Sequence, residues 1–222
     1  MKISPSMMCA DFIHLKAAVD TFGDLGIEYL HIDIMDGHYV PNFTLGIDYC
    51  RALRGYCAIP LDIHLMIEDV DKFGPEFAAI PNSLITFHPE VCYHPLRTIQ
   101  AIRKAGARVG IAIDPALTLE AVKPLLPEVD LVCVMTVNPG YSGQRLIPQT
   151  LTKLQALAHY LHQQGYSIEI EVDGNVSWEN IPAMVSAGAE VLVAGTSSIF
   201  DNRALLEDNI ARMRQLFAVQ SA

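Results

Sequence analysis

Residues 29–37 read Tyr-Leu-His-Ile-Asp-Ile-Met-Asp-Gly, a short run in which aliphatic side chains alternate with other types. Successive side chains of a β-strand point to opposite faces, so His31, Asp33 and Met35 would share one face and the aliphatic residues the other. The aliphatic face suits packing against helices. The polar face suits the interior of a barrel near the carboxyl ends of its strands, where barrels carry their chemistry. An open sheet covered by helices would be apolar on both faces, so this segment favours a barrel over an open doubly wound sheet.

Similar short runs, rich in Val and Ile and bounded by Gly, Pro, Asp or Asn, recur along the 222 residues and predict strands. Helical patterns lie between them, with apolar residues falling on one face. The eight expected strands are Ile3–Ser6, Tyr29–Met35, Leu61–Ile67, Ser83–His88, Arg108–Ile113, Leu131–Val137, Ser167–Asp173 and Val191–Gly195. Eight strands alternating with helices predict an α/β protein, a single (β/α)8 TIM barrel domain spanning residues 1–222.

The chain is acidic, with 15 Lys+Arg against 25 Asp+Glu and a formal net charge of -10. This balance argues against a nucleic-acid partner or an anionic membrane partner. The sequence contains no run of 18 apolar residues, so we expect no membrane span. The N-terminus lacks the layout of a secretory signal. Five scattered cysteines without a CxxC pair suggest reduced thiols, so we expect a cytoplasmic protein. The charge would also slow capture of an anionic substrate unless its site is locally positive.

Histidine and aspartate recur on the predicted inner face of three strands. In residues 61–67 the same alternation places His64 inward, and in residues 167–173 it places Asp173 inward at the strand end. Together with His31 and Asp33 they form a set of two His and two Asp that suits Zn, Mn, Fe or Co, among which the ligand types do not choose. Each residue alone also fits a structural role, a His–Asp hydrogen bond or a turn Asp. Together they predict one divalent metal ion per chain, with Glu171 as a candidate partner of the ligands.

The two carboxylates suggest a reaction. Asp33 and Asp173 come from strands that are far apart in the expected ring, so they could lie on opposite sides of a bound substrate. One would take a proton from one face while the other gives a proton to the opposite face. A metal between them would stabilise the enolate oxygen formed between the two steps. The sequence therefore predicts an isomerase that inverts a carbon next to a carbonyl.

Glycine-containing loops follow the last three expected strands and predict an anion site. Gly140 and Gly143 follow the sixth strand, Gly174 the seventh, and Gly195 with Thr196 the eighth. Backbone N–H groups in such loops, and a short extra helix after the last strand, commonly hold phosphate in barrels. Each glycine alone is as compatible with an ordinary turn. A phosphate site built from backbone N–H groups would explain how an acidic protein binds an anion. Arg145 is the nearest basic residue in these loops, and the sequence assigns it no role.

Five ordered segments carry a resemblance to a known family: residues 4–6, 31–42, 62–66, 135–140 and 172–174. With them the chain resembles the ribulose-phosphate 3-epimerase family over nearly its full length. The resemblance implies a (β/α)8 barrel that epimerises a ketose phosphate at carbon 3 through a metal-bound enediolate. It implies His31, Asp33, His64 and Asp173 as metal ligands, with Asp33 and Asp173 as the acid/base pair. It implies substrate contacts from Ser6, His64, Gly140, Tyr141, Ser142, Gly143, Gly174, Asn175, Gly195 and Thr196.

The chain departs from the usual pentulose-phosphate pattern at several positions. Residues 140–143 read Gly-Tyr-Ser-Gly, so Tyr141 and Ser142 stand at the middle positions of the usual Gly-Phe-Gly-Gly. Asn175 replaces a glycine, and Cys9 and the segment 88–90 also differ. These features resemble the D-allulose-6-phosphate 3-epimerase branch. A side chain in place of glycine could also shift the phosphate and alter the preferred sugar length. We therefore expect conversion of D-allulose 6-phosphate to D-fructose 6-phosphate, with D-ribulose 5-phosphate to D-xylulose 5-phosphate as the alternative.

Two other functions remain to be weighed against an epimerase. A metal-independent lyase or decarboxylase on the same barrel would need a catalytic Lys at a strand tip, and none stands there. A non-catalytic sugar-phosphate sensor would not need the complete acid/base and ligand set. We therefore expect a small-molecule sugar phosphate as the partner, and a homo-oligomer, since barrels of this kind often associate.

Overall fold

The computed structural model describes residues 1–220, with side chains described for residues 1–218. Strands and helices alternate along nearly the whole of it. The strands are β1 (Lys2–Pro5), β2 (Leu30–Asp36), β3 (Phe43–Thr44), β4 (Leu61–Met66), β5 (Ser83–Phe87), β6 (Arg108–Ile113), β7 (Leu131–Met135), β8 (Glu169–Asp173) and β9 (Val191–Ala194). The α-helices are α1 (Leu15–Asp24), α2 (Ile47–Tyr56), α3 (Val70–Ala78), α4 (Pro95–Ala105), α5 (Leu119–Val122), α6 (Gln149–Gln164), α7 (Ile181–Ser186) and α8 (Leu206–Gln220).

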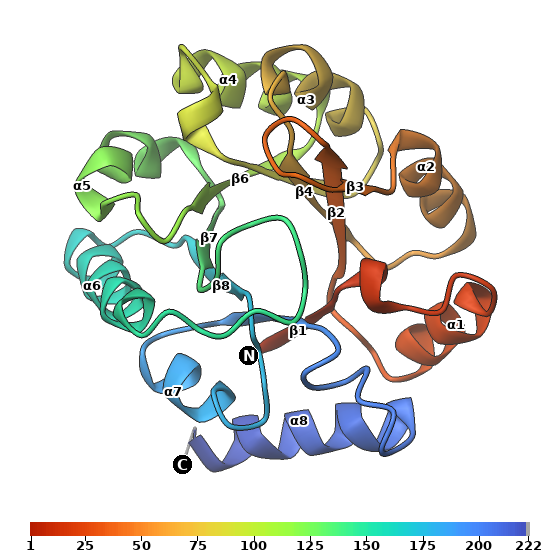
Figure 1. Cartoon of the computed structure of the whole chain (residues 1–222). Helices are drawn as coiled ribbons and strands as arrows, with labels where there is room; N and C mark the ends of the chain where they lie inside the picture. The colour runs from red at the N-terminus through yellow and green to blue at the C-terminus, as the bar shows by residue number, and fades with distance from the viewer. Residues whose placement is uncertain (221–222) are drawn as a thin grey trace.

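The strands form one curled sheet in the order β1-β9-β8-β7-β6-β5-β4-β2-β3, and a ring of helices surrounds it (Figure 1). All pairings are parallel except that of β2 with β3. Between β1 and β2 the structure has a single parallel bridge, which joins Ser6 to His31. The α/β class and the eight expected strands are confirmed, with strand ends displaced by at most two residues.

The ninth strand, β3, was not expected from the sequence. It is only two residues long, and it pairs antiparallel with the end of β2, opposite Met35 and Asp36. The chain reverses at Gly37, whose φ of 72° lies in the left-handed region that favours glycine. A Cβ atom at that position would lie 2.3 Å from the ring of the exposed Phe43, so a larger residue would also require that ring to move.

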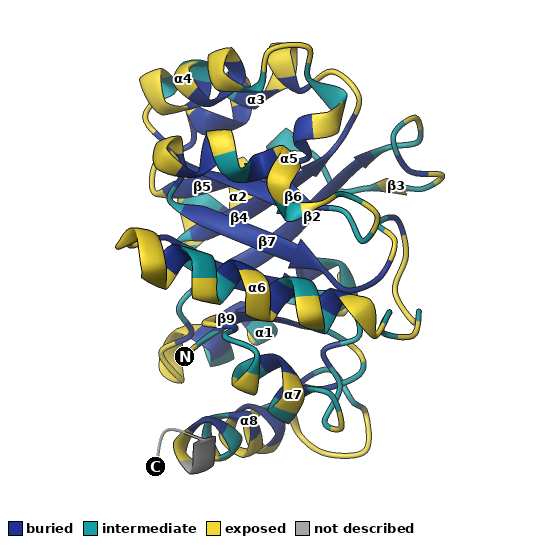
Figure 2. Ribbon diagram, turned by 90° about the vertical axis from the view of Figure 1, so that its left-hand side faces the viewer, coloured by how far each residue is buried: buried dark blue, intermediate teal, exposed yellow. Residues whose placement is uncertain are grey.

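Alternating side chains divide the sheet into two apolar environments. The outward set, which includes Ile32, Ile63 and Val132, belongs to a large cluster shared with the helices. Inside the curl lies a separate, smaller cluster: Tyr29, Leu84, Ala112, Leu131, Cys133, Met135 and Val191. Figure 2 shows the strands as a buried layer beneath helices that are buried on one side and exposed on the other. The inner face is thus free to carry polar groups at the carboxyl ends of the strands.

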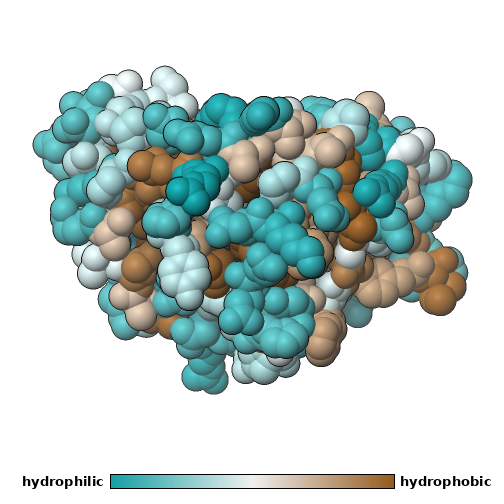
Figure 3. Space-filling view, turned by 90° about the horizontal axis from the view of Figure 1, so that it is seen from above, coloured by the Kyte–Doolittle hydropathy of each residue, from teal (hydrophilic) through white to brown (hydrophobic). Residues whose placement is uncertain are grey.

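The helices form because their apolar residues recur at helical spacing. Leu154, Leu157 and Leu161 of α6 are buried, and the helix ends at Gly165 with a φ of 68°. On the outer surface seen in Figure 3, polar side chains are interspersed with apolar ones. Within the described residues no helix is long and apolar enough to cross a membrane.

Candidate active site

Strand register brings histidine and aspartate side chains together. In the pairing of β2 with β4, His31 stands opposite Asp62, and Asp33 stands opposite His64. All four side chains therefore lie on the inner face, with Asp33 and His64 one layer nearer the carboxyl ends of the strands than His31 and Asp62. Asp173 joins them from the end of β8, which is not a neighbour of either strand in the sheet. The expected convergence of three strands on one site is what the structure has.

The two histidines and two of the aspartates form a compact cluster. His31 Nε2 lies 3.2 Å from Asp33 Oδ1 and 3.9 Å from Asp173 Oδ2. His64 Nδ1 lies 3.5 Å and 3.7 Å from the same two oxygens. One ligand atom from each of the four residues lies within 4.8 Å of all the others. Both imidazoles are fully buried, and only the Asp173 side chain keeps some exposure, 18%.

The cluster fits a divalent cation. His64 Nδ1 is buried and has no hydrogen-bond partner, although it faces both carboxylates. A buried polar atom without a partner costs about 1–3 kcal/mol, so this nitrogen needs a ligand or a proton. Two imidazole nitrogens and two carboxylate oxygens are a donor set that Zn, Mn, Fe and Co all accept, and it does not choose among them.

A second layer of polar groups lies beneath the cluster. His31 Nδ1–H donates to Asp62 Oδ2 at 2.6 Å, and the Ser4 hydroxyl donates to the same oxygen at 3.0 Å. Because a carboxylate can only accept, the bond fixes the Nδ1–H form of His31 and leaves Nε2 facing the cluster. Glu171 lies nearby, with an oxygen 3.9 Å from His31 Nδ1 and both oxygens buried.

The environments of the two candidate acid/base groups differ. Burial raises the pKa of Asp33, but the adjacent His31 outweighs it, so the pKa falls well below its ordinary value. The pKa of Asp173 is raised, because burial and the neighbouring negative charge of Asp33 together outweigh the attraction of His31. Environments that separate the pKa values of two carboxylic groups are typical of acid/base pairs.

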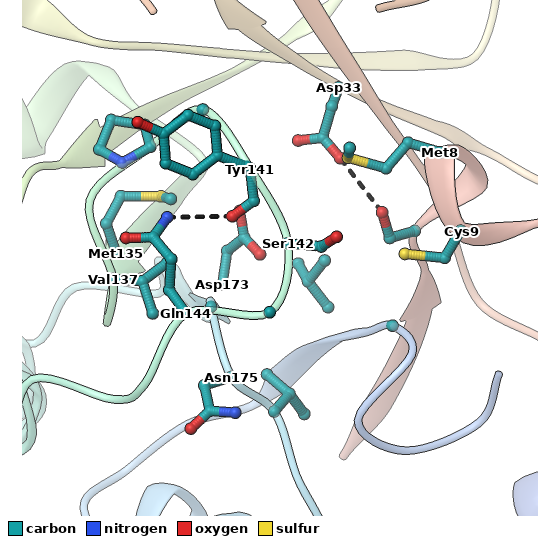
Figure 4. Close-up of a pocket in the computed structure, with 18 of the residues that line it drawn as sticks. Met8, Cys9, Asp33, Met135, Val137, Tyr141, Ser142, Gln144, Asp173 and Asn175 are labelled. Atoms are coloured by element: carbon teal, nitrogen blue, oxygen red, sulfur yellow. Dashed lines mark hydrogen bonds between the residues drawn. The ribbon is translucent and has the colours of Figure 1, made fainter. Parts of the chain in front are cut away.

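A pocket opens above the cluster at the carboxyl ends of the strands. Asp33 and Asp173 line it on different sides, with the loop of Tyr141, Ser142 and Gln144 between β7 and α6 (Figure 4). Ser6, expected to contact substrate, also lines it and donates to Asp33 Oδ2 at 3.1 Å. The three buried methionines at this depth line its walls: Met35, Met66 and Met135.

All the residues expected to hold phosphate line this pocket: Gly140, Tyr141, Ser142, Gly143, Gly174, Asn175, Gly195 and Thr196. Among the described residues around it there is no lysine or arginine. Arg145 lies instead in a neighbouring surface depression with Arg203 and Arg212. Positive potential in the pocket must therefore come from backbone N–H groups, or from a cation.

Two contacts brace the loop after β7. Asn42 Nδ2 donates to the Gly140 carbonyl at 3.0 Å. Gly140 has a φ of 126°, and a Cβ there would lie 3.2 Å from the Val40 side chain. The segment after β2 and the glycine loop after β7 thus pack on each other, which explains why both occur in one sequence.

Asn175 occupies a left-handed conformation with a φ of 44°, which asparagine tolerates better than most residues. Its side-chain oxygen accepts from the backbone N–H of Leu146 at 3.0 Å and from Asn180 Nδ2 at 2.9 Å. The side chain therefore ties the loop after β8 to the loop after β7, a role that the sequence did not indicate.

The structure brings the four expected ligand residues together beside one pocket, and it adds neighbours that the sequence did not indicate. His31 and His64 are fully buried and are not among the residues that line the pocket, and the substrate contact expected of His64 stays a prediction. The contact of Asp62 with His31 and that of His88 with His64 do not follow from the sequence. The signal for Asp62 was present in the alternation of residues 61–67, but its partner depends on strand register.

Comparison with known proteins shows the family to which the chain belongs. A model of the ribulose-phosphate 3 epimerase family matches residues 2–200. The ribulose-phosphate 3-epimerase of Escherichia coli (strain K12) is 42% identical over 200 residues, which cover 90% of this chain and 88% of the relative. That of Bacillus subtilis (strain 168) is 38% identical over 198 residues, 89% of this chain and 91% of the relative.

A solved structure supports the fold. The 3-hexulose-6-phosphate synthase from Salmonella typhimurium superposes with a TM-score of 0.68 at 16% identity, covering 99% of this chain and 100% of that one. At this identity the likeness concerns the fold alone, which is of TIM-barrel type. The family assignment rests on the sequence matches above: the chain belongs to the ribulose-phosphate 3-epimerase family and is an epimerase of the isomerase class.

Proposed function

We propose that the chain interconverts D-ribulose 5-phosphate and D-xylulose 5-phosphate by inverting carbon 3, with Asp33 and Asp173 as the acid/base pair. The observation that carries the proposal is the arrival of these two carboxylates in one pocket from non-adjacent strands, beside two buried histidines. The names of the curated relatives support the pentulose substrate over the hexulose that the sequence alone led us to expect.

The chain's own residues account for the proton movements. One carboxylate removes the proton from carbon 3 on its side of the substrate, which leaves an enediolate, and the other delivers a proton from the opposite side. The apolar walls formed by Met35, Met66 and Met135 exclude water from the reacting carbon. The backbone N–H groups of the glycine loops bind the phosphate and orient the sugar.

The proposal includes a divalent metal ion held by His31, Asp33, His64 and Asp173. The unpartnered His64 Nδ1 and the donor set support it. When bound, such an ion supplies positive charge that offsets the negative charge developing on the substrate oxygens.

We further propose that the sheet closes into a (β/α)8 barrel forming one domain over residues 1–222. The parallel bridge between Ser6, which directly follows β1, and His31 of β2 supports closure, because these two strands would meet at the seam. The phosphate loops after β7, β8 and β9 and the ligands on β2 and β4 then face one another across the mouth of the barrel.

D-allulose 6-phosphate is the second candidate substrate. Asn175 and Ser142 favour it, because they place side chains where the pentulose-phosphate pattern has glycine. Parallel measurement of kcat/KM for both sugar phosphates separates the two. We expect the higher value for D-ribulose 5-phosphate, and a clear preference for the hexulose would reverse the substrate assignment while leaving the chemistry intact.

The chemistry is tested in deuterium oxide. We expect the epimer that forms to carry solvent deuterium at carbon 3, because the proton removed and the proton delivered belong to different groups. Asp33→Asn and Asp173→Asn should each lower kcat by about 10²- to 10⁴-fold, the usual contribution of a general acid or base. Glu68→Gln, at an exposed carboxylate after β4, is the control and should leave kcat unchanged. Epimerisation without exchange of carbon 3 hydrogen would contradict the mechanism.

A further inference from the structure

His88 is a buried histidine that the proposed reaction does not use. It follows β5 directly and is fully buried. Its ring stacks on that of His64, with centroids 5.1 Å apart and an interplanar angle of 25°. The Tyr39 ring covers it at 4.8 Å. Both of its ring nitrogens have partners, so the contacts determine which nitrogen carries hydrogen.

The chain of contacts starts at Glu90. His88 Nδ1 lies 3.2 Å from Glu90 Oε1, and the Tyr39 hydroxyl donates to the same oxygen at 2.8 Å. Burial raises the pKa of Glu90, but its bonds to His88 and Tyr39 outweigh burial and lower it, so the group is a carboxylate at neutral pH. A carboxylate only accepts, and His88 Nδ1 therefore carries the hydrogen.

The position of hydrogen on His88 determines the position of hydrogen on His64. In neutral His88 with hydrogen on Nδ1, Nε2 is an acceptor. His64 Nε2 lies 3.0 Å from it and must therefore be the donor. Hydrogen on Nε2 leaves a lone pair on His64 Nδ1, the buried nitrogen that faces Asp33 and Asp173 and has no hydrogen-bond partner.

We propose that His88, oriented by Glu90, is a positioning residue that holds His64 in its Nε2–H form so that Nδ1 is available to the metal. This inference rests on the metal-dependent site proposed above. It gives the two histidine ligands different supports, because Asp62 holds His31 and a neutral imidazole holds His64.

The charge of the interior explains the difference. Asp33, Asp62, Glu171 and Asp173 already gather around the cluster. A further carboxylate directly on His64 would add to the repulsion among the charged members of this set at low dielectric. With His88 in between, the charge of Glu90 sits one ring further out, on a side chain that is 31% exposed.

Zinc binding and histidine NMR test the inference together. Zinc affinity is measured by competition with a chromophoric chelator, and the ring nitrogens of ¹⁵N-labelled histidines in the zinc-loaded protein show which nitrogen carries hydrogen. We expect His64 to carry hydrogen on Nε2. His88→Leu should weaken zinc binding by about 10- to 100-fold, the usual effect of removing a partner of a ligand.

Three further variants separate positioning from packing. His88→Gln supplies an amide oxygen that accepts from His64 Nε2–H, so it should restore most of the affinity. Glu90→Leu leaves the buried His88 ring in place and should reduce zinc affinity less than His88→Leu does. Hydrogen should then be distributed over both ring nitrogens of His88. His94→Leu removes an exposed histidine from the same loop and should change neither readout.

The outcomes that overturn the inference are distinct from failure of the proposed function. Hydrogen on His64 Nδ1 in the wild-type protein, or His88→Gln as damaging as His88→Leu in a folded protein, overturns the positioning role. Should His88→Leu not fold, unchanged affinity and tautomers in Glu90→Leu overturn it. Failure of zinc to bind overturns the metal site as well, whereas absence of epimerase turnover with tight zinc binding overturns only the reaction.

Discussion

At the residue scale, one side chain, that of Asn175, joins the two loops that line the pocket after β7 and β8. Asn175 holds a left-handed backbone conformation and at the same time bonds to Leu146 and Asn180. Glycine would adopt the same conformation at no steric cost but would leave the Leu146 N–H without its partner. The two loops that line the phosphate end would then be held together less firmly.

Asn175→Gly should therefore raise KM for the sugar phosphate severalfold while kcat stays within about twofold, because the change affects binding rather than the carboxylates. The free energy of unfolding should change little, because glycine removes the strain of the left-handed backbone conformation. That gain offsets the loss of about 0.5–1.5 kcal/mol from the missing hydrogen bond. Steady-state kinetics with both candidate substrates measure the effect, with the exposed Asn202→Gly as control. A fall in kcat at constant KM would place Asn175 in the chemistry instead.

At the element scale, β8 shows how one alternating strand can supply three different environments. Its inward carboxylates are Glu169, Glu171 and Asp173, from the amino end of the strand to the carboxyl end. Asp173 faces the pocket, and Glu171 lies fully buried beneath the cluster. Glu169 lies at the other end of the sheet, where Lys2 approaches it at 2.8 Å and Arg108 at 2.6 Å.

The pH dependence of stability should report on Glu169. Burial raises its pKa, but the bonds to Lys2 and Arg108 outweigh burial, and the folded-state pKa lies below the ordinary value of 4.5. A lowered pKa contributes stability that is fully present above the unfolded pKa and disappears as pH falls through the folded one. Glu169→Gln should thus cost about 1 kcal/mol at pH 7, as expected for a partly exposed pair of ion pairs.

Urea unfolding at pH 7, 5 and 3.5 measures this difference. The gap between wild type and Glu169→Gln should narrow as pH falls below about 4.5, because the wild-type side chain becomes neutral as well. Glu120→Gln, which removes a more exposed pair with Lys123, should show a smaller gap throughout. A gap that widens on acidification would contradict the assigned role of Glu169.

The elements themselves were largely predictable, because alternation and strand length are local properties. The inward parity of His31, Asp33 and His64 follows from sequence and agrees with the structure. The register between strands does not follow from parity, since a shift by two residues preserves every face. This is why the partners of Asp62 and His88 escaped prediction, as did β3, whose two residues are too few to form a pattern.

At the scale of the whole molecule, the charge distribution opposes the approach of the substrate. The formal net charge is -10, and a bound divalent cation would leave it strongly negative. The described pocket lining contributes no basic side chain, so attraction begins only at short range, at the backbone N–H groups. Added salt should therefore accelerate encounter with a sugar phosphate, the opposite of its effect on enzymes that steer anions with basic patches.

We expect kcat/KM to rise by about two- to threefold between 10 mM and 150 mM sodium chloride, as the screening length falls from roughly 30 Å to 8 Å. Chloride is used because phosphate and sulfate would compete at the pocket. The charge origin is tested with Glu76→Lys and Glu128→Lys together, two exposed positions near the ends of elements that lead into the amino ends of strands, away from the pocket. The pair changes the formal charge by four, from -10 to -6, so kcat/KM at low salt should increase and its salt dependence should weaken. A fall in kcat/KM with added salt would mean that a basic group, such as Arg145, reaches the phosphate during binding.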